Sequence, residues 1–178
     1  LYYNTANNLT AVGYRALHSN TTGAPNCAFG LYALRNNTSG QRNNAVGYEA
    51  LRANTFGNDN NAFGNAALYG NTTGSNNNAF GTSALVSNTI GDNNNAFGRG
   101  SLLSNTTGSN NNAFGLYSLN YNTIGVSNSA FGRESLFSNI TGNYNVAVGH
   151  NSLRSSVGTS NSVFGSYSGY DISTGSSN

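Results

Sequence analysis

Glycine recurs along this chain at an almost fixed spacing of 17 residues. Each of these glycines closes an Ala-Phe-Gly or Ala-Val-Gly triplet, with Val163 in place of Ala in the last one, 16 residues after its predecessor. The glycines are Gly13, Gly30, Gly47, Gly64, Gly81, Gly98, Gly115, Gly132, Gly149 and Gly165. A period held over so many units indicates a tandem-repeat protein, in which stacking on neighbours stabilises each unit.

Other positions of the unit repeat with the same period. A leucine follows each of the first nine glycines by four residues; Asn-Thr-x-Gly and an Asn-rich run come after it. The consensus is A-F-G-x-x-[AS]-L-x-x-N-T-[TI]-G-x-N-N-N. The residue after Asn-Thr alternates between Thr or Ser and a bulky apolar residue, as in Thr73, Ile90, Thr107 and Ile124. This alternation adds a secondary period of 34.

The composition favours a repeat fold over disorder. Only 7% of the residues are charged, the chain has one Pro, and every basic residue is an Arg. Disordered chains are typically charged or Pro-rich and poor in aromatic residues. This chain instead contains 11 Tyr and 9 Phe.

The unit is too short and too polar to bury a core alone, and its Asn and Gly content disfavours a helix. We expect two extended segments per unit, Asn-Asn-Ala-Phe and x-[Ala/Ser]-Leu-x, with corners at Gly and at Asn-Thr-x-Gly. The prediction is an all-β protein, a parallel β-solenoid of ten 17-residue coils forming one domain over residues 1–178. Its coils begin at Ala11, Ala28, Ala45, Ala62, Ala79, Ala96, Ala113, Ala130, Ala147 and Val163.

Stacking would place identical side chains in ladders about 4.8 Å apart, so ten coils would span roughly 50 Å. Two apolar ladders are expected to fill the interior. The first comprises Phe29, Phe63, Phe80, Phe97, Phe114 and Phe131. The second, the Leu column, comprises Leu17, Leu34, Leu51, Leu68, Leu85, Leu102, Leu119, Leu136 and Leu153. Asn side chains are expected to form amide ladders at the corners.

The Asn-Asn-Ala-Phe-Gly-x-x-[Ala/Ser] core resembles the head repeats of YadA-like trimeric autotransporter adhesins. Ser129-Ala130-Phe131-Gly132 and Asn161-Ser162-Val163-Phe164-Gly165 match those repeats best. The longer Asn-Thr-Thr-Gly form resembles repeats of bacterial surface proteins and phage tail-fibre-like proteins. The resemblance covers essentially the whole chain, although family head units are about 14 residues long. It implies a left-handed β-roll, three chains side by side, and an extracellular surface role.

No catalytic, cofactor or metal constellation is apparent in the sequence. His18 and His150 lie nearly eight coils apart, and Cys27 is the only cysteine, so neither a nucleophile–base pair nor a metal site is expected. The seven Arg are scattered and the net charge is +2, which argues against nucleic acid as a partner. The longest apolar runs are too short for membrane insertion. We therefore expect no enzyme.

Asn-x-Thr and Asn-x-Ser sequons raise the hypothesis of N-glycans along one edge. The candidate acceptors are Asn20, Asn37, Asn71, Asn105 and Asn139. The alternative interpretation is that Asn-Thr-Thr-Gly is simply a turn. A Thr ladder running from Thr21 to Thr123 raises ice binding as a minor alternative, although the position beside it alternates.

The expected function is a structural or adhesive fibre segment of an extracellular surface adhesin or tail-fibre-like protein. We expect it to be homotrimeric, with host or surface glycans as further partners. The alternative is a self-assembling extracellular filament whose subunits stack end to end and carry N-glycans. Because the chain begins at Leu1 within a unit, we expect it to be a segment of a longer chain.

Overall fold

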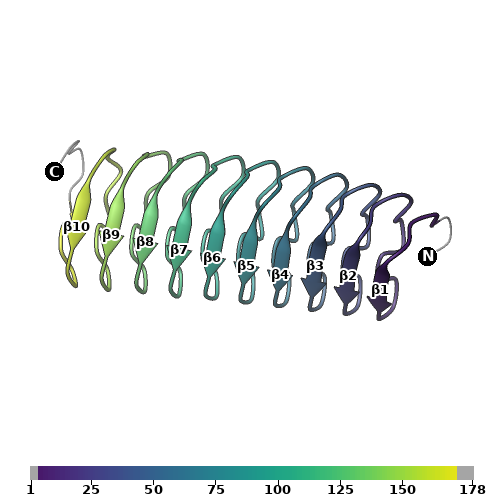
Figure 1. Ribbon diagram of the computed structural model, residues 1–178. Helices are drawn as coiled ribbons and strands as arrows, with labels where there is room; N and C mark the ends of the chain where they lie inside the picture. Colours follow the sequence, from purple (N-terminus) through teal and green to yellow (C-terminus); the bar gives the residue numbers. More distant parts are fainter. Residues whose placement is uncertain (1–3, 172–178) are drawn as a thin grey trace.

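The computed structural model describes residues 4–171, and each repeat in it forms one coil of an all-β solenoid. Every coil contributes one short strand, and the ten strands form one parallel sheet in chain order (Figure 1). The strands are β1 (Leu9–Val12), β2 (Asn26–Phe29), β3 (Asn43–Val46), β4 (Asn61–Phe63), β5 (Asn78–Phe80), β6 (Asn95–Phe97), β7 (Asn112–Phe114), β8 (Ser129–Phe131), β9 (Val146–Val148) and β10 (Ser162–Phe164). The predicted all-β parallel β-solenoid is confirmed.

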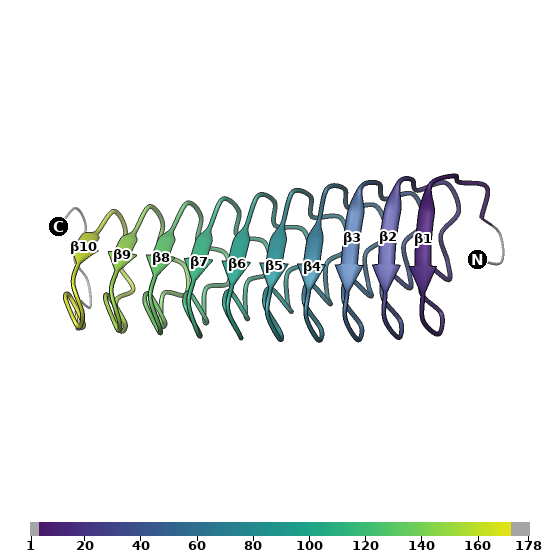
Figure 2. The same cartoon turned by 60° about the horizontal axis from the view of Figure 1, so that its bottom comes forward.

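Equivalent residues of successive repeats lie side by side in the sheet. Ala62 pairs with Ala45 on one side and with Ala79 on the other, and the same alignment holds along the solenoid. Figure 2 shows the coils in a single row, with a tight loop after each strand. Each strand contacts only the strands before and after it. The positions of the repeat therefore become straight columns of side chains along the axis.

Each strand ends at the glycine of its triplet. Gly64 has a φ of +144°, and a Cβ built on it would lie 2.6 Å from the carbonyl oxygen of Gly81 in the next coil. A side chain there would meet both a backbone clash and an unfavourable φ. The glycine column is therefore required by the close approach of successive coils.

The prediction of a second extended segment, at x-[Ala/Ser]-Leu-x, is wrong, because the chain there forms consecutive turns. In the second coil, the amide of Ala33 donates to Gly30 (3.3 Å) and that of Arg35 donates to Tyr32 (3.2 Å). Tyr32 and Leu34 have φ values of 60° and 48°. A left-handed conformation costs a non-glycine residue roughly 1–2 kcal/mol. Complete burial of Leu34 and a 2.9 Å hydrogen bond from its amide to Ala50 offset that cost.

Leucine and small side chains fill the interior. Each leucine of the Leu column is fully buried, as predicted. The alanines in the middle of β2 to β9 are fully buried as well. The residue before each leucine is Ala or Ser, also buried, and Ser101, Ser118 and Ser135 donate hydrogen bonds to the glycine carbonyls of their own coils. The core is therefore a narrow stack of small and medium side chains.

The predicted interior position of the phenylalanines is wrong. Phe29, Phe63 and Phe131 are 54%, 38% and 41% exposed, and Phe80, Phe97 and Phe114 are half-buried. Successive residues of a strand point to opposite faces, so the alanine and the phenylalanine of one triplet cannot both face inward. Alanine takes the interior because the narrow coil leaves no room for a benzyl group beside the leucine. The phenylalanines do form a ladder, but it lies on the outer surface.

Two buried ladders of asparagine hold the corners. The first is the Asn-Thr column, in which Asn71 Nδ2 donates to Asn54 Oδ1 in the preceding coil (2.8 Å) and to Gly74 O in its own (2.9 Å). The members of the Asn-Thr column are Asn20, Asn37, Asn54, Asn71, Asn88, Asn105, Asn122 and Asn139. The second is the corner Asn column, in which Asn60 Nδ2 donates to Gly74 O (2.8 Å) and the backbone N–H of Asn60 donates to Asn43 Oδ1 (3.0 Å). The members of the corner Asn column are Asn26, Asn43, Asn60, Asn77, Asn94, Asn111, Asn128, Asn145 and Asn161.

Residues 4–171 contain no helix with the length and apolar character that crossing a membrane requires.

Candidate interaction surfaces

The outer side of the sheet, which we call the sheet face, carries two side-chain columns. In β6, Ala96 is buried while Asn95 and Phe97 on either side of it are half-buried. The Phe column comprises Val12, Phe29, Val46, Phe63, Phe80, Phe97, Phe114, Phe131, Val148 and Phe164. The outer column comprises Thr10, Cys27, Asn44, Asn61, Asn78, Asn95, Asn112, Ser129, Val146 and Ser162. Neither column contains a charged residue, so the face is uncharged over its whole length.

The phenylalanine rings of neighbouring coils are stacked in parallel. From Phe63 to Phe131, successive ring centroids lie 4.7–5.1 Å apart with interplanar angles of 5–8°. Each inner ring therefore has both faces covered by its neighbours, and only ring edges reach the surface. A sugar stacks on a ring face, so this ladder offers it little. Ring edges instead fit an apolar protein surface.

Amide groups form a second ladder beside the rings. Asn44, Asn61, Asn78 and Asn95 each donate through Nδ2 to Oδ1 of the asparagine in the following coil, at 2.8–2.9 Å. These hydrogen bonds fix the side chains and flatten the face. Sheet faces with stacked rings and amide ladders are the surfaces that pair in dry sheet-to-sheet interfaces.

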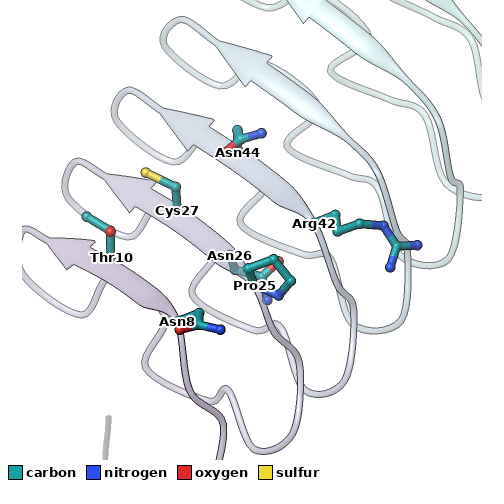
Figure 3. A pocket seen from close by; sticks show the side chains of 7 residues that line it. All are labelled: Asn8, Thr10, Pro25, Asn26, Cys27, Arg42 and Asn44. Atoms are coloured by element: carbon teal, nitrogen blue, oxygen red, sulfur yellow. The ribbon is translucent and has the colours of Figure 1, made fainter.

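The outer column changes character at its first strands. Figure 3 shows Thr10, Cys27 and Asn44 at matching places on β1, β2 and β3. They border a hollow of about 270 Å³, which Asn8, Pro25, Asn26 and Arg42 complete. Cys27 is a half-buried free thiol. The amide ladder therefore begins only at Asn44.

A different surface runs along the turns that follow the strands. We call it the turn edge, and it is formed by Tyr14, Arg15, Leu31, Tyr32, Arg35, Tyr48, Glu49, Arg52, Tyr69, Arg99, Tyr117, Arg133, Glu134, Phe137, Arg154 and Tyr170. Guanidinium groups lie over aromatic rings in several coils: Arg52 is 5.6 Å from the Tyr32 centroid and 5.5 Å from that of Tyr69. Arg and Tyr are the residues most enriched at binding hot spots. The sequence did not predict this association of tyrosine with arginine.

An ion pair between Arg154 and Glu134 joins two neighbouring coils on this edge. Arg154 Nε donates to Glu134 Oε2 (2.9 Å) and Arg133 donates to Glu134 Oε1 (3.1 Å). The hydrogen bond from Arg154 is the main cause of a lowered pKa at Glu134; burial opposes the shift, and Arg133 adds to it. Away from this edge, the hydrogen bond from Arg42 lowers the pKa of Asp59. These carboxylates are stabilised in their ionised form.

The candidate glycan acceptors lie inside the solenoid, which contradicts the hypothesis of N-glycans along one edge. Asn37, Asn71, Asn105 and Asn139 are 0% exposed and Asn20 is 1% exposed. They belong to the Asn-Thr column, and their Nδ2 atoms, which would carry a glycan, donate two hydrogen bonds each. The buried amide ladder therefore removes these five positions as glycan sites. The turn interpretation of Asn-Thr-Thr-Gly matches the geometry.

The threonines that follow the Asn-Thr column use their hydroxyl groups within the solenoid. Thr72 Oγ1 donates to Thr89 O (3.0 Å), and Thr89 Oγ1 donates to Thr106 O (3.0 Å). Both side chains are half-buried. The next position carries exposed Ile90 and Ile124 in alternate coils. This corner therefore lacks the flat, free hydroxyl array on which the ice-binding alternative depends.

Titratable side chains are dispersed rather than gathered. His18 is on the first coil and His150 on the ninth, eight coils and roughly 38 Å apart at about 4.8 Å per coil. Within residues 4–171, no group of three or more His, Cys, Asp or Glu side chains is placed to hold a metal ion. The surfaces with distinctive chemistry are therefore the sheet face and the turn edge.

Comparisons of this chain with protein-family models, with curated proteins and with solved structures found no match.

Proposed function

We propose that this chain is a structural segment of an extracellular fibre, in a surface adhesin or a tail-fibre-like protein, whose copies pack side by side through the sheet face. The observation that carries the proposal is the uncharged ladder of stacked phenylalanine rings on the outer surface. Contiguous apolar surface of this kind is unusual on a monomer and is typical of interaction sites.

The size of the face supports self-association. Phe63 and Phe131 are 38% and 41% exposed, and Phe29 and Phe164 are 54% and 71% exposed. The Phe column has seven phenylalanines and three valines. If a Phe side chain offers about 200 Å² and two fifths of it remains exposed, the seven rings leave roughly 560 Å² of apolar surface. The valines and the outer column add to this area, which brings the face near the ~800 Å² that each partner contributes to a standard interface.

A second copy also matches the face geometrically. Ring centroids repeat every 4.7–5.1 Å, and only a partner with the same rise per coil can meet every ring over the full length. Because the face is uncharged, two copies meet without like-charge repulsion. A homotrimer, as the resemblance to adhesin head repeats implies, is our first expectation for the number of chains. A pair related by a two-fold axis is the simplest other closed form.

The second candidate is an end-to-end filament. The parallel, in-register stacking of the strands favours the filament. The backbone groups on one edge of any coil can form hydrogen bonds with those on the opposite edge of another coil. Both candidates are extracellular structural roles, and we propose no catalytic activity. The dispersed acids and histidines support that part of the proposal.

Molar mass in solution, measured by light scattering on the full chain, tests the proposal. A discrete trimer or dimer is expected, and Phe80→Arg/Phe114→Arg should convert it to monomer by placing buried charges in the interface. The control is Ile90→Arg/Ile124→Arg, which adds the same charge to the same two coils away from the sheet face; the assembly should remain. Open-ended polymers would support the filament instead. A monomeric wild-type chain, or equal loss in both variants, would overturn packing through the sheet face.

A further inference from the structure

We propose that the first three coils of the turn edge form a binding site for an acidic sugar, meaning a pyranose that carries a carboxylate or a sulfate. Arg15 and Arg35 would bind the anion, and the surface formed by Tyr14, Leu31 and Tyr48 would contact the ring. This site is separate from the sheet face, and its existence does not depend on how the copies assemble.

Three guanidinium groups and two tyrosine rings form one cluster there. The rings of Tyr14 and Tyr32 meet edge to face, with centroids 5.7 Å apart and an interplanar angle of 67°. Arg15 lies 5.3 Å from the Tyr14 centroid, and Arg35 lies 5.2 Å from that of Tyr32. Arg52 lies 5.6 Å from the same Tyr32 ring. The rings therefore hold several positive charges close together.

The cluster has more cations than anions. Its one carboxylate, Glu49, accepts a 2.9 Å hydrogen bond from Arg52, whose Nη1 also donates to the Tyr69 hydroxyl (2.8 Å). In the described part of the chain, neither Arg15 nor Arg35 has a carboxylate within 4 Å. Each of these two arginines lies beside a tyrosine ring instead.

Arg35 provides a specific point of attachment. Its Nε is buried and has no hydrogen-bond acceptor among residues 4–171. Arg35 as a whole is half-buried, so an oxyanion would bind the outer nitrogens of its guanidinium and not Nε. A carboxylate or sulfate there would neutralise the excess charge, and the planar guanidinium favours such oxyanions geometrically.

The neighbouring apolar surface indicates a sugar rather than a free anion. Tyr14, Leu31 and Tyr48 occupy the same position in three successive coils and are 59%, 39% and 45% exposed. Successive coils lie about 4.8 Å apart, so this platform is long enough for a pyranose ring and its linkage. An exposed apolar platform bordered by two arginines matches a ring with one apolar side and a charged substituent.

Isothermal titration calorimetry on the full chain tests the site with three probes. These are an oligogalacturonate, a sulfated galactan and a neutral galacto-oligomer of similar length. The acidic probes should bind and the neutral one should not, and their ranking identifies carboxylate or sulfate as the preferred group. Arg15→Gln/Arg35→Gln should weaken binding by at least about tenfold, because both anion-binding groups are lost. Arg99→Gln/Arg133→Gln removes the same charge further along the turn edge and should change affinity less than about twofold.

Circular dichroism establishes that each variant is folded. If Arg15→Gln/Arg35→Gln is not folded, the single variant Arg15→Gln, at an exposed residue, takes its place. Absence of binding to both acidic probes would overturn the proposal. Equal losses in the two double variants would also overturn it, since they indicate diffuse charge attraction. Poly-L-glutamate provides the last contrast: binding as tight as that of oligogalacturonate would assign the site to acidic peptides instead.

Discussion

Asparagine side chains determine the corners of this solenoid at the level of single residues. In the Asn-Thr column, one Nδ2 atom donates both along the axis and within its own coil, as Asn88 does to Asn71 Oδ1 (2.9 Å) and to Gly91 O (3.0 Å). Where the next coil has Ser156 instead of asparagine, Asn139 Oδ1 is left buried without a donor. Each amide therefore depends on an identical amide in the adjacent coil.

Replacing Asn88 by Ala should destabilise the chain by about 2–5 kcal/mol. The change leaves Asn71 Oδ1 without a donor and one hydrogen of Asn105 Nδ2 without an acceptor, both inside the protein. Urea denaturation measures the loss. Asn95→Ala in the outer column is the matched control when both changes are made in the monomeric Phe80→Arg/Phe114→Arg variant. There it should cost less than about 1 kcal/mol, because water can replace an amide on an unpacked surface. Equal costs would contradict the distinction between buried and outer ladders.

Individual coils are held to each other by backbone columns and, on the turn edge, by charge. Glu134 in the eighth coil bonds Arg154 in the ninth, and its pKa lies below the ordinary value of 4.5 mainly because of that bond. A lowered pKa in the folded state means that the carboxylate stabilises the fold above pH 4.5. This contribution declines as the pH falls through the lowered pKa.

Glu134→Gln should therefore reduce stability at pH 7 and have a much smaller effect at pH 3. Thermal unfolding of the variant and of the wild-type chain at both pH values measures the difference. Asp171→Asn, which alters an exposed acid outside the ion pair, is the control and should show no comparable change. The same deficit at pH 3 as at pH 7 would exclude the ion pair as its source.

The sequence predicted the period, the parallel sheet and the buried leucines, because glycine, leucine and asparagine recur at one spacing. It did not predict which side of the strand faces inward, since hydrophobicity favours phenylalanine over alanine. A constant side-chain size along a column would have indicated the inward position better than hydrophobicity did. The inward position is alanine in nine repeats, whereas the Phe column contains both phenylalanine and valine. The turns around Leu34 escaped prediction because leucine rarely adopts a φ near +50°. The Arg and Tyr cluster depends on contacts between coils, which no single repeat reveals.

At the scale of the whole molecule, stability is the sum of coils and of the contacts between neighbouring coils. Each strand contacts only the preceding and following strands, so no contact between non-adjacent coils determines how many coils the solenoid has. The sheet face and the turn edge differ in how much they vary from coil to coil. The sheet face is nearly uniform along the axis, whereas the chemistry of the turn edge changes from coil to coil.

Deleting residues 79–95 should therefore leave a folded solenoid. The deletion joins Asn78 to Ala96 and so restores the Asn-Ala junction of an ordinary repeat. The denaturant m-value should fall by about one tenth, because it scales with the surface exposed on unfolding. Deleting residues 79–86 removes about half a coil and should prevent cooperative folding, since every later column would be out of register. A folded product of the half-coil deletion would contradict the register argument.

The straight columns also bear on how such a gene can change. A duplication or loss of one repeat's coding sequence inserts or removes a complete layer, and every other layer keeps its contacts. Unequal recombination between similar repeats should then produce folded chains of different length. In this architecture the number of coils can change without any change to the core, while point substitutions on the turn edge change the chemistry of that surface.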